Sequence, residues 1–140
     1  MKLDRSKDEA AILIANAAFY RAFSKGDYAA MSALWALRAP VACFHPTSPG
    51  LLGRDAVLES WRQILRNSPS FDMRCDRPVV HLASGEAAFV TCYEGNGDHP
   101  AHLAATNVFV LEDGSWRIVH HHAGPLASPI SKPASQSAAN

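Results

Sequence analysis

The stretch HLAATNVFVLEDGSWRIVHHHA, residues 102–123, decides the fold, because two apolar runs flank the dipeptide Asp113-Gly114. Asp-Gly between two such runs is the strongest short-range signal for a β-hairpin, since both turn positions need a positive φ. The pattern therefore predicts one strand over 102–112, a two-residue turn, and a second strand over 115–123.

A two-residue turn also fixes the register, because the residues then pair outward from Glu112 opposite Ser115. Side chains alternate between the two faces of a strand. One face of the hairpin is predicted to carry Ala105, Asn107, Phe109, Leu111, Trp116, Ile118, His120 and His122. The other face is predicted to carry Thr106, Val108, Val110, Arg117, Val119 and His121. We expect the first face, which has the larger aromatic content, to lie under helices.

The valines of the second face would be exposed in a monomer. A contiguous apolar patch on a surface indicates an interaction site, so we predict a homodimer through this outer face of the sheet. The expected contact residues are Val108, Val110, Arg117 and Val119. A β-rich surface that stays monomeric is the alternative.

The first half of the chain has a helical period instead. Apolar residues recur at helical spacing from Asp8 to Ser24, and Gly26-Asp27 can end that helix and cap the next. Three helices are predicted: one over 8–24, one from residue 28, and one from about residue 55 to the Asn67-Ser68-Pro69 stop. Before the hairpin, strands are predicted over 41–45, 71–83 and 87–94. Helices followed by a meander predict an α+β fold, with three N-terminal helices packed on a strongly curved antiparallel sheet.

Length and composition indicate one globular domain. The chain has 140 residues, of which 48% are hydrophobic, and we predict a single domain over 1–127. From residue 128 onward Ser, Ala, Pro and Asn dominate, which predicts a flexible tail over 128–140. The 13 basic residues balance 13 acidic residues, so there is no basic excess to attract nucleic acid.

The sequence also indicates a compartment. No apolar run approaches the ~20 residues that cross a bilayer, so we expect no membrane partner. The three cysteines (Cys43, Cys75 and Cys92) form no CxxC motif. They are expected to be small buried hydrophobic residues in a reducing cytoplasm, which is the predicted location.

The predicted inner face changes from apolar to polar along its length. It begins at Trp116 and Ile118 and ends with Asn107, His120 and His122. Buried imidazoles and amides need partners, so three of them at one end predict a cavity that holds water or a small ligand. The expected apolar walls are Phe19, Tyr20, Trp35, Phe44, Trp61 and Trp116. The alternative is that these histidines only form structural hydrogen bonds.

Other chemistries have weaker signals. His120 and His122 have a spacing that can chelate zinc on a strand, but no third ligand is fixed among His45, His102, Glu94 and Asp98. We therefore predict no metal and no cofactor. There is no G-x-S-x-G nucleophile motif and no Gly-rich phosphate loop.

Three motifs resemble a known family. They are FYRAFSKGD at 19–27, LGRDAV at 52–57 and GSWRIVHHHA at 114–123. In this order they resemble the SnoaL-like and ketosteroid-isomerase-like branch of the NTF2-like superfamily, over about residues 10–125. The resemblance implies a curved sheet wrapped around three helices, a central pocket and a dimer.

The resemblance also implies candidate roles. In ketosteroid isomerases a helical Tyr stabilises an oxyanion and an Asp-Pro shuttles the proton. The matching places here are Phe19 and His45-Pro46, so ketosteroid isomerisation itself is not expected. His45 can still act as a base, or it can be a structural histidine at a strand end.

The sequence thus leaves two functional hypotheses. The first is a small-molecule-binding protein that acts as a cofactor-free isomerase, dehydratase or cyclase on a small apolar or polyketide-like substrate. In it His45 is the base, His120 or His122 the acid or orienting group, and Asn107 a polarising donor. The second is a non-catalytic binding or oligomerisation module resembling the calcium/calmodulin-kinase association domain, which shares the closing motif.

Overall fold

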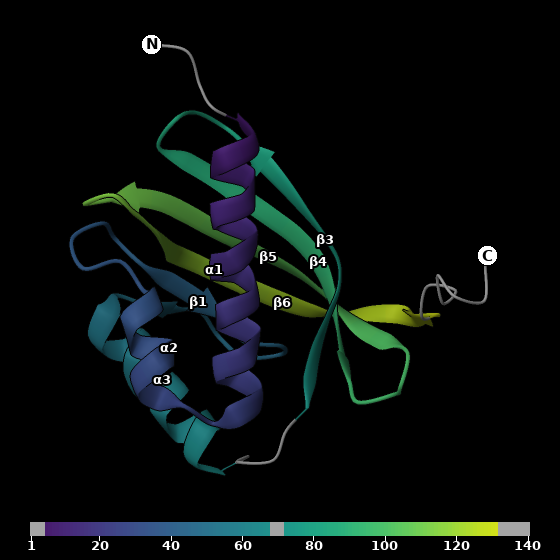
Figure 1. Cartoon of the computed structure of the whole chain (residues 1–140). Coiled ribbons are helices and arrows are strands. Elements are labelled where there is room, and N and C mark those ends of the chain that lie inside the picture. The colour runs from purple at the N-terminus through teal and green to yellow at the C-terminus, as the bar shows by residue number, and fades with distance from the viewer. Residues whose placement is uncertain (1–4, 68–71, 132–140) are drawn as a thin grey trace.

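The chain folds into three helices and one six-stranded sheet. The computed structural model describes residues 5–67 and 72–131 (Figure 1). The helices are α1 (Arg5–Lys25), α2 (Tyr28–Leu34) and α3 (Arg54–Asn67), and the strands are β1 (Ala42–Phe44), β2 (Leu51–Leu52), β3 (Met73–Leu82), β4 (Ala87–Asn96), β5 (Ala101–Glu112) and β6 (Ser115–Ile130). The strand order is β2-β1-β6-β5-β4-β3. The predicted α+β class is confirmed.

The sheet is mostly antiparallel, but β1 runs parallel to β6. The short strand β2, which the sequence pattern did not predict, pairs with β1. Strand β6 continues to Ile130, three residues past the predicted domain boundary at 127. Three parts of the predictions lie outside the described residues. They are the helix stop at 68–69, the first residue of the strand predicted over 71–83, and the tail over 132–140.

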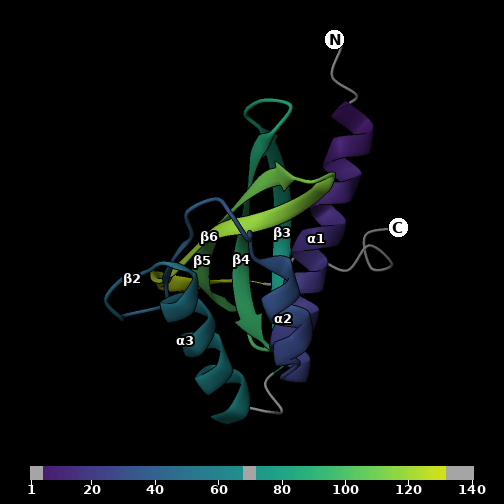
Figure 2. The same cartoon turned by 90° about the vertical axis from the view of Figure 1, so that its left-hand side faces the viewer.

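Helix α1 crosses one face of the sheet, with α2 and α3 beside its C-terminal half (Figures 1 and 2). Its buried residues include Ile12, Asn16, Phe19 and Tyr20, which are spaced by three or four positions and so lie on one side of the helix. Asn16 is a polar residue within this otherwise apolar side. It faces the sheet, where it takes part in the site described below.

Local chemistry sets the junction between α1 and α2. Gly26 has a φ of 66°, a conformation that ends helices and that glycine adopts without strain. The side chain of Asp27 then accepts a hydrogen bond from the backbone N–H of Ala30 at 3.0 Å. The helix stop and the helix cap expected from the Gly-Asp pair are both confirmed.

The two-residue turn of the long hairpin is confirmed as well. Asp113 and Gly114 have φ values of 52° and 80°, the positive values that a tight hairpin turn requires. The predicted pairs hold from Glu112 opposite Ser115 as far as Phe109 opposite Ile118. Up to this point the register follows from the turn alone.

Beyond Ile118 the predicted register is wrong, because β6 contains a bulge at Val119. Val108 pairs with His120, and Asn107 pairs with His121. One extra residue on one strand reverses the faces of everything that follows it. His121 is therefore the buried histidine, with 1% of its surface exposed, whereas His120 and His122 lie on the opposite face.

The connection between α2 and β1 is fixed by a single carboxylate. Glu112 accepts hydrogen bonds from the backbone N–H groups of Leu37, Arg38 and Ala39, at 2.8, 3.1 and 3.1 Å. The bond from Leu37 is the main cause that lowers the pKa of Glu112 below its usual value of 4.5. Since β1 follows this connection, the carboxylate helps to position the start of β1.

Glu112→Gln should lower the melting temperature at pH 7, because an amide accepts these three bonds less well than a carboxylate does. Because the pKa of Glu112 is lower in the folded state, its carboxylate stabilises the folded protein above pH 4.5. This contribution is lost as the pH falls through the folded-state pKa. The difference in melting temperature between wild type and variant should therefore shrink below pH 4.5. A difference that does not change with pH, or that the exposed Glu86→Gln control reproduces, would contradict this role.

Within residues 5–67 and 72–131, no helix combines the length and the apolar character needed to cross a membrane.

Candidate functional site

A cavity of about 180 Å³, called here the inner cavity, lies between the helices and the sheet. Its apolar lining residues are Phe23, Pro46, Ile64, Met73 and Leu103. Three ionisable side chains also line it: His45, Glu94 and His121. A cavity of ~150 Å³ holds one benzene molecule, so the inner cavity suits a molecule with about one ring. Apolar walls with a few convergent polar groups are typical of small-molecule sites.

Glu94 is the buried carboxyl group of the inner cavity. It lies on β4 at an inward position, and only 1% of its surface is exposed. The hydroxyl of Tyr20 donates a hydrogen bond to Glu94 Oε2 at 2.7 Å. Burial raises the pKa of Glu94 to about 7, although the Tyr20 bond opposes the rise. The carboxyl group therefore changes its charge near neutral pH.

His121 is held by a neighbouring amide. Its Nδ1 lies 2.6 Å from Asn107 Oδ1, while Asn107 Nδ2 donates to Asn16 Oδ1 at 2.9 Å and to the Tyr20 hydroxyl at 3.2 Å. Since the amide uses its N–H groups there, its oxygen must accept, and Nδ1 of His121 carries the proton. The lone pair of Nε2 is left 3.8 Å from Glu94 Oε2.

His121 is neutral at physiological pH. Burial, with smaller contributions from the charges of His45, His120 and His122, lowers its pKa to about 3. The contact between His121 and Glu94 is therefore not an ion pair. It instead brings a neutral imidazole nitrogen beside a carboxyl group that titrates near pH 7.

Tyr20 connects the amide and the carboxyl group. It accepts from Asn107, donates to Glu94, and lies 3.3 Å from Cys92 Sγ. Burial, followed by the charge of Glu94, raises its pKa well above 10, so it remains a phenol. The hydrogen bonds thus run in one direction, from His121 through Asn107 and Tyr20 to Glu94.

His45 follows β1 and also lines the inner cavity, with its ring centre 6.4 Å from that of His121. Its Nε2 is 3.0 Å from the hydroxyl of Ser60 on α3, and that hydroxyl donates to the carbonyl of Val57 at 2.7 Å. Ser60 therefore accepts from His45, which leaves Nδ1 of His45 as an acceptor. Burial lowers the pKa of His45, so this side chain is also neutral at pH 7.

The structure brings together five of the residues that the sequence predicted for the site. His45 lines the cavity, Tyr20 and Asn107 belong to the hydrogen-bonded chain, and the rings of Phe19 and Trp61 lie 5.0 and 5.8 Å from that of His121. The resemblance matched the helical tyrosine of the isomerases to Phe19. In the structure the phenol beside the polar groups belongs to Tyr20, one position later.

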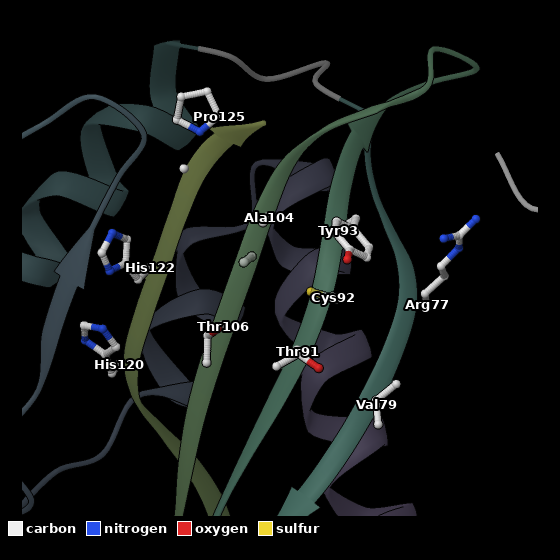
Figure 3. Close-up of a pocket in the computed structure, with 12 residues that line it drawn as sticks. Arg77, Val79, Thr91, Cys92, Tyr93, Ala104, Thr106, His120, His122 and Pro125 are labelled. Carbon is white, nitrogen blue, oxygen red and sulfur yellow. The ribbon is translucent and has the colours of Figure 1, made fainter. Parts of the chain in front are cut away.

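The other predicted residues lie elsewhere. His120 and His122 face an open groove of about 850 Å³ on the far side of the sheet, called here the outer groove (Figure 3). Phe44 stacks on His122, with ring centres 4.8 Å apart. Trp35 is buried beside Ile118, and Trp116 is half-buried near the hairpin turn. The expectation that His120 and His122 share the inner cavity is wrong, because the Val119 bulge turns them outward.

Three residues of this site were not predicted as members of it: Asn16, His121 and Glu94, which was considered only as a possible third metal ligand. Glu94 had a detectable signal, since it ends a run of inward positions on β4 at which the other members, Ala88, Val90 and Cys92, are apolar. Asn16 likewise interrupts the apolar side of α1. A polar residue on an otherwise buried face is the signal that could have identified both.

The ionisable groups that line the inner cavity, His45, Glu94 and His121, offer acid–base chemistry. Burial raises the pKa of Cys43 to about 12, so its reactive thiolate is not populated at neutral pH. Among residues 5–67 and 72–131, no three His, Cys, Asp or Glu side chains lie close enough together to hold a metal ion.

The chain belongs to the SnoaL-like domain family, whose model matches residues 12–128. Among solved structures it is similar to a candidate dehydratase of the NTF2-like family from Streptomyces avermitilis, with 32% identity and a TM-score of 0.81 over 89% of this chain and 99% of that one.

Two other similarities are to a kinase association domain and to an F-box protein. A candidate association domain of a calcium/calmodulin-dependent protein kinase type II from Thiobacillus denitrificans is 35% identical, with a TM-score of 0.67 over 80% of this chain and 92% of that one. The F-box protein SKIP8 of Arabidopsis thaliana is 26% identical over 116 residues, 83% of this chain. The match covers 50% of SKIP8, so this chain corresponds to about half of that protein.

The raised pKa of Glu94 predicts a stability effect with a definite sign. A carboxyl group whose pKa rises from 4.5 to about 7 on folding stabilises the protein below pH 4.5, and this contribution disappears as the pH rises through 7. Glu94→Gln removes the titration. The free energy of unfolding of the variant, relative to wild type, should therefore increase by about 2–3 kcal/mol between pH 5 and pH 8. Urea unfolding at both pH values measures it.

The exposed substitution Glu9→Gln on α1 is the matched control and should leave the pH dependence of stability unchanged. If Glu94→Gln gives the same difference from wild type at pH 5 and pH 8, Glu94 is not the buried group that titrates near neutral pH.

Proposed function

We propose that this protein binds a small, mostly apolar molecule in the inner cavity and catalyses cofactor-free proton transfer on it, as an isomerase, dehydratase or cyclase. The observation that carries the proposal is Glu94, a carboxyl group buried against an apolar cavity with a pKa of about 7. A general base works best when its pKa lies near the working pH.

Glu94 is the proton-transferring group in this proposal. As a carboxylate it removes a proton from a carbon beside a carbonyl group. As the resulting carboxylic acid it returns that proton, either to another carbon or to a leaving hydroxyl. In the second case the carbon–oxygen bond breaks and water departs. The similarity to the candidate dehydratase supports the second case.

The other polar groups orient the reaction. Nε2 of His121 and Nδ1 of His45 are acceptors, and both side chains line the cavity, so either can bind a hydroxyl group of the substrate. Asn107 donates to Asn16 and Tyr20, so it holds His121 in place and is not the polarising donor that the sequence suggested. His120 and His122 have no role in this reaction.

The ring opening of 5-nitrobenzisoxazole tests the proposal without knowledge of the natural substrate. A base removes the proton on C3, the N–O bond breaks, and the coloured 2-cyano-4-nitrophenolate forms. The wild-type kcat/KM should rise with pH through an inflection near 7, as Glu94 ionises. Glu94→Gln should lower it by about 100-fold or more.

His122→Ala on the outer face is the control and should retain wild-type turnover. A wild-type protein that is no faster than acetate at the same pH and concentration would refute proton-transfer catalysis. Equal rates for wild type and Glu94→Gln would refute the role of Glu94.

A non-catalytic binding or assembly module is the second candidate. The similarity to the candidate kinase association domain supports it, and so does the outer face of the sheet, which carries two in-register rows of side chains. One row is His81, Phe89, Val108 and His120, and the other is Val79, Thr91, Thr106 and His122. Phe89 and Val79 are 37% and 50% exposed.

We propose that this outer face forms a homodimer, in agreement with the valine patch noted in the sequence. Val108 remains on this face, between Phe89 and His120, while Val110 and the bulged residue Val119 are half-buried and pack against the core. We also propose a cytoplasmic location, which the free thiols of Cys43, Cys75 and Cys92 support.

Val108→Asp should convert the dimer to a monomer, because it would bury a charge at the centre of the proposed contact. Sedimentation equilibrium at micromolar concentration measures the mass, and circular dichroism checks that the variant is folded. Ile14→Asp, at an exposed apolar position on α1, is the control and should remain dimeric. A monomeric wild type would refute the dimer.

A further inference from the structure

A second hollow adjoins the inner cavity. It has a volume of about 520 Å³ and lies between α3 and the chain that connects β1 to β2; it is called here the α3 groove. His45 and Ile64 line both the inner cavity and the α3 groove. These two side chains therefore form the wall at which the two spaces meet.

The polar lining of the α3 groove differs from that of the inner cavity. Its polar side chains besides His45 are Ser48, Ser60, Gln63 and Asn67, all of them uncharged hydrogen-bonding groups. His45 is itself neutral at pH 7, because burial lowers its pKa. The α3 groove thus offers hydrogen bonds without a compensating charge for an ionised ligand.

Charges next to the groove also disfavour an ion. Gln63 Nε2 donates to the carboxylate of Glu59 at 3.1 Å, and Glu59 is paired with Arg62 at 3.5 Å. Because these two charges already compensate each other, neither is available to offset the desolvation of an ionised ligand group. An uncharged hydrogen-bonding group does not carry this cost.

His45 is held at the boundary by a hydrogen bond to the Ser60 hydroxyl. The inner cavity alone holds about one ring. A longer ligand must therefore extend past His45.

We propose that the α3 groove is a second subsite, which binds the uncharged, hydrogen-bonding tail of a ligand whose apolar ring lies in the inner cavity beside Glu94 and His121. This inference rests on the proposed function in that it assigns both parts to one ligand. The ligand class is then an elongated molecule with a carbonyl-bearing ring at one end and an amide or hydroxyl tail at the other. An ionised tail of either sign is disfavoured, because the polar side chains that line the groove carry no charge to offset its desolvation.

Four probes that share one ring test the subsite by isothermal titration calorimetry. Acetophenone has the ring alone, N-(2-hydroxyethyl)-4-acetylbenzamide adds a neutral tail, 3-(4-acetylphenyl)propanoate adds an anionic tail, and 3-(4-acetylphenyl)propylammonium adds a cationic tail. The neutral-tailed probe should bind about tenfold more tightly than acetophenone, as expected for one or two net hydrogen bonds. The charged tails should add less than about twofold, because their desolvation is not compensated by an opposite charge.

Substitutions test whether the gain in affinity arises in the α3 groove. The double substitution Ser48→Ala with Gln63→Leu should abolish the tenfold gain and leave the affinity for acetophenone unchanged. Arg66→Gln, an exposed position on the same helix that lines neither space, is the control and should keep the gain. In amide NMR spectra the neutral-tailed probe should shift the signals of Ser48 and Gln63, which acetophenone should not.

Several outcomes would refute the subsite: a neutral tail that adds no affinity, a gain that survives the double substitution, a charged tail that binds as well as the neutral one, or no binding of any probe.

Turnover of 5-nitrobenzisoxazole, measured on the same samples, separates this proposal from the proposed function. Turnover without a gain from the neutral tail refutes the subsite alone, and a gain without turnover refutes the catalysis alone.

Discussion

The bulge at Val119 is the constraint on which the rest of the site depends. The hairpin turn fixes the pairing up to Phe109 opposite Ile118, and a regular ladder would then place His120 opposite Asn107. The extra residue places His121 there instead. Without it, the buried amide of Asn107 would meet a different imidazole, and the neighbours of Glu94 would change with it. A single unpaired residue in β6 thus determines which histidine faces the cavity.

Burying five polar side chains between α1 and the sheet costs free energy that apolar residues of the same size would not cost. The cost is limited because each group has a partner: Asn107 bonds to His121, Asn16 and Tyr20, and Tyr20 bonds to Glu94. The network fixes the tautomer of His121 and the direction of the Tyr20 hydroxyl. It leaves Glu94 with one strong donor in an apolar setting, which keeps its pKa near 7 instead of near 4.5.

The features that the sequence predicted correctly are those that depend on local chemistry. The helix stop at Gly26, the cap at Asp27 and the turn at Asp113-Gly114 each follow from a few neighbouring residues, and together with the hydrophobic periods they indicate the α+β fold. The register beyond Ile118 does not follow in this way, because a bulge is selected by packing between strands and helix that are far apart in the sequence. Glu94 was missed as a site residue for a related reason. Its partner Tyr20 lies 74 positions away, so the sequence shows a carboxyl group on a strand but not what surrounds it.

The three consecutive histidines show why environment, and not residue type, assigns chemistry in this fold. His121 is fully buried, and its pKa falls to about 3, so it is a fixed neutral acceptor. His120, on the other face, is only partly buried, and burial lowers its pKa without removing its contact with solvent. His122 is exposed and stacks on Phe44. Side chains alternate along β6, so the two faces differ: His121 lines the cavity, whereas His120 and His122 lie on a surface that can contact a partner. The bulge keeps these tasks apart, because it places a single imidazole of the three beside Glu94.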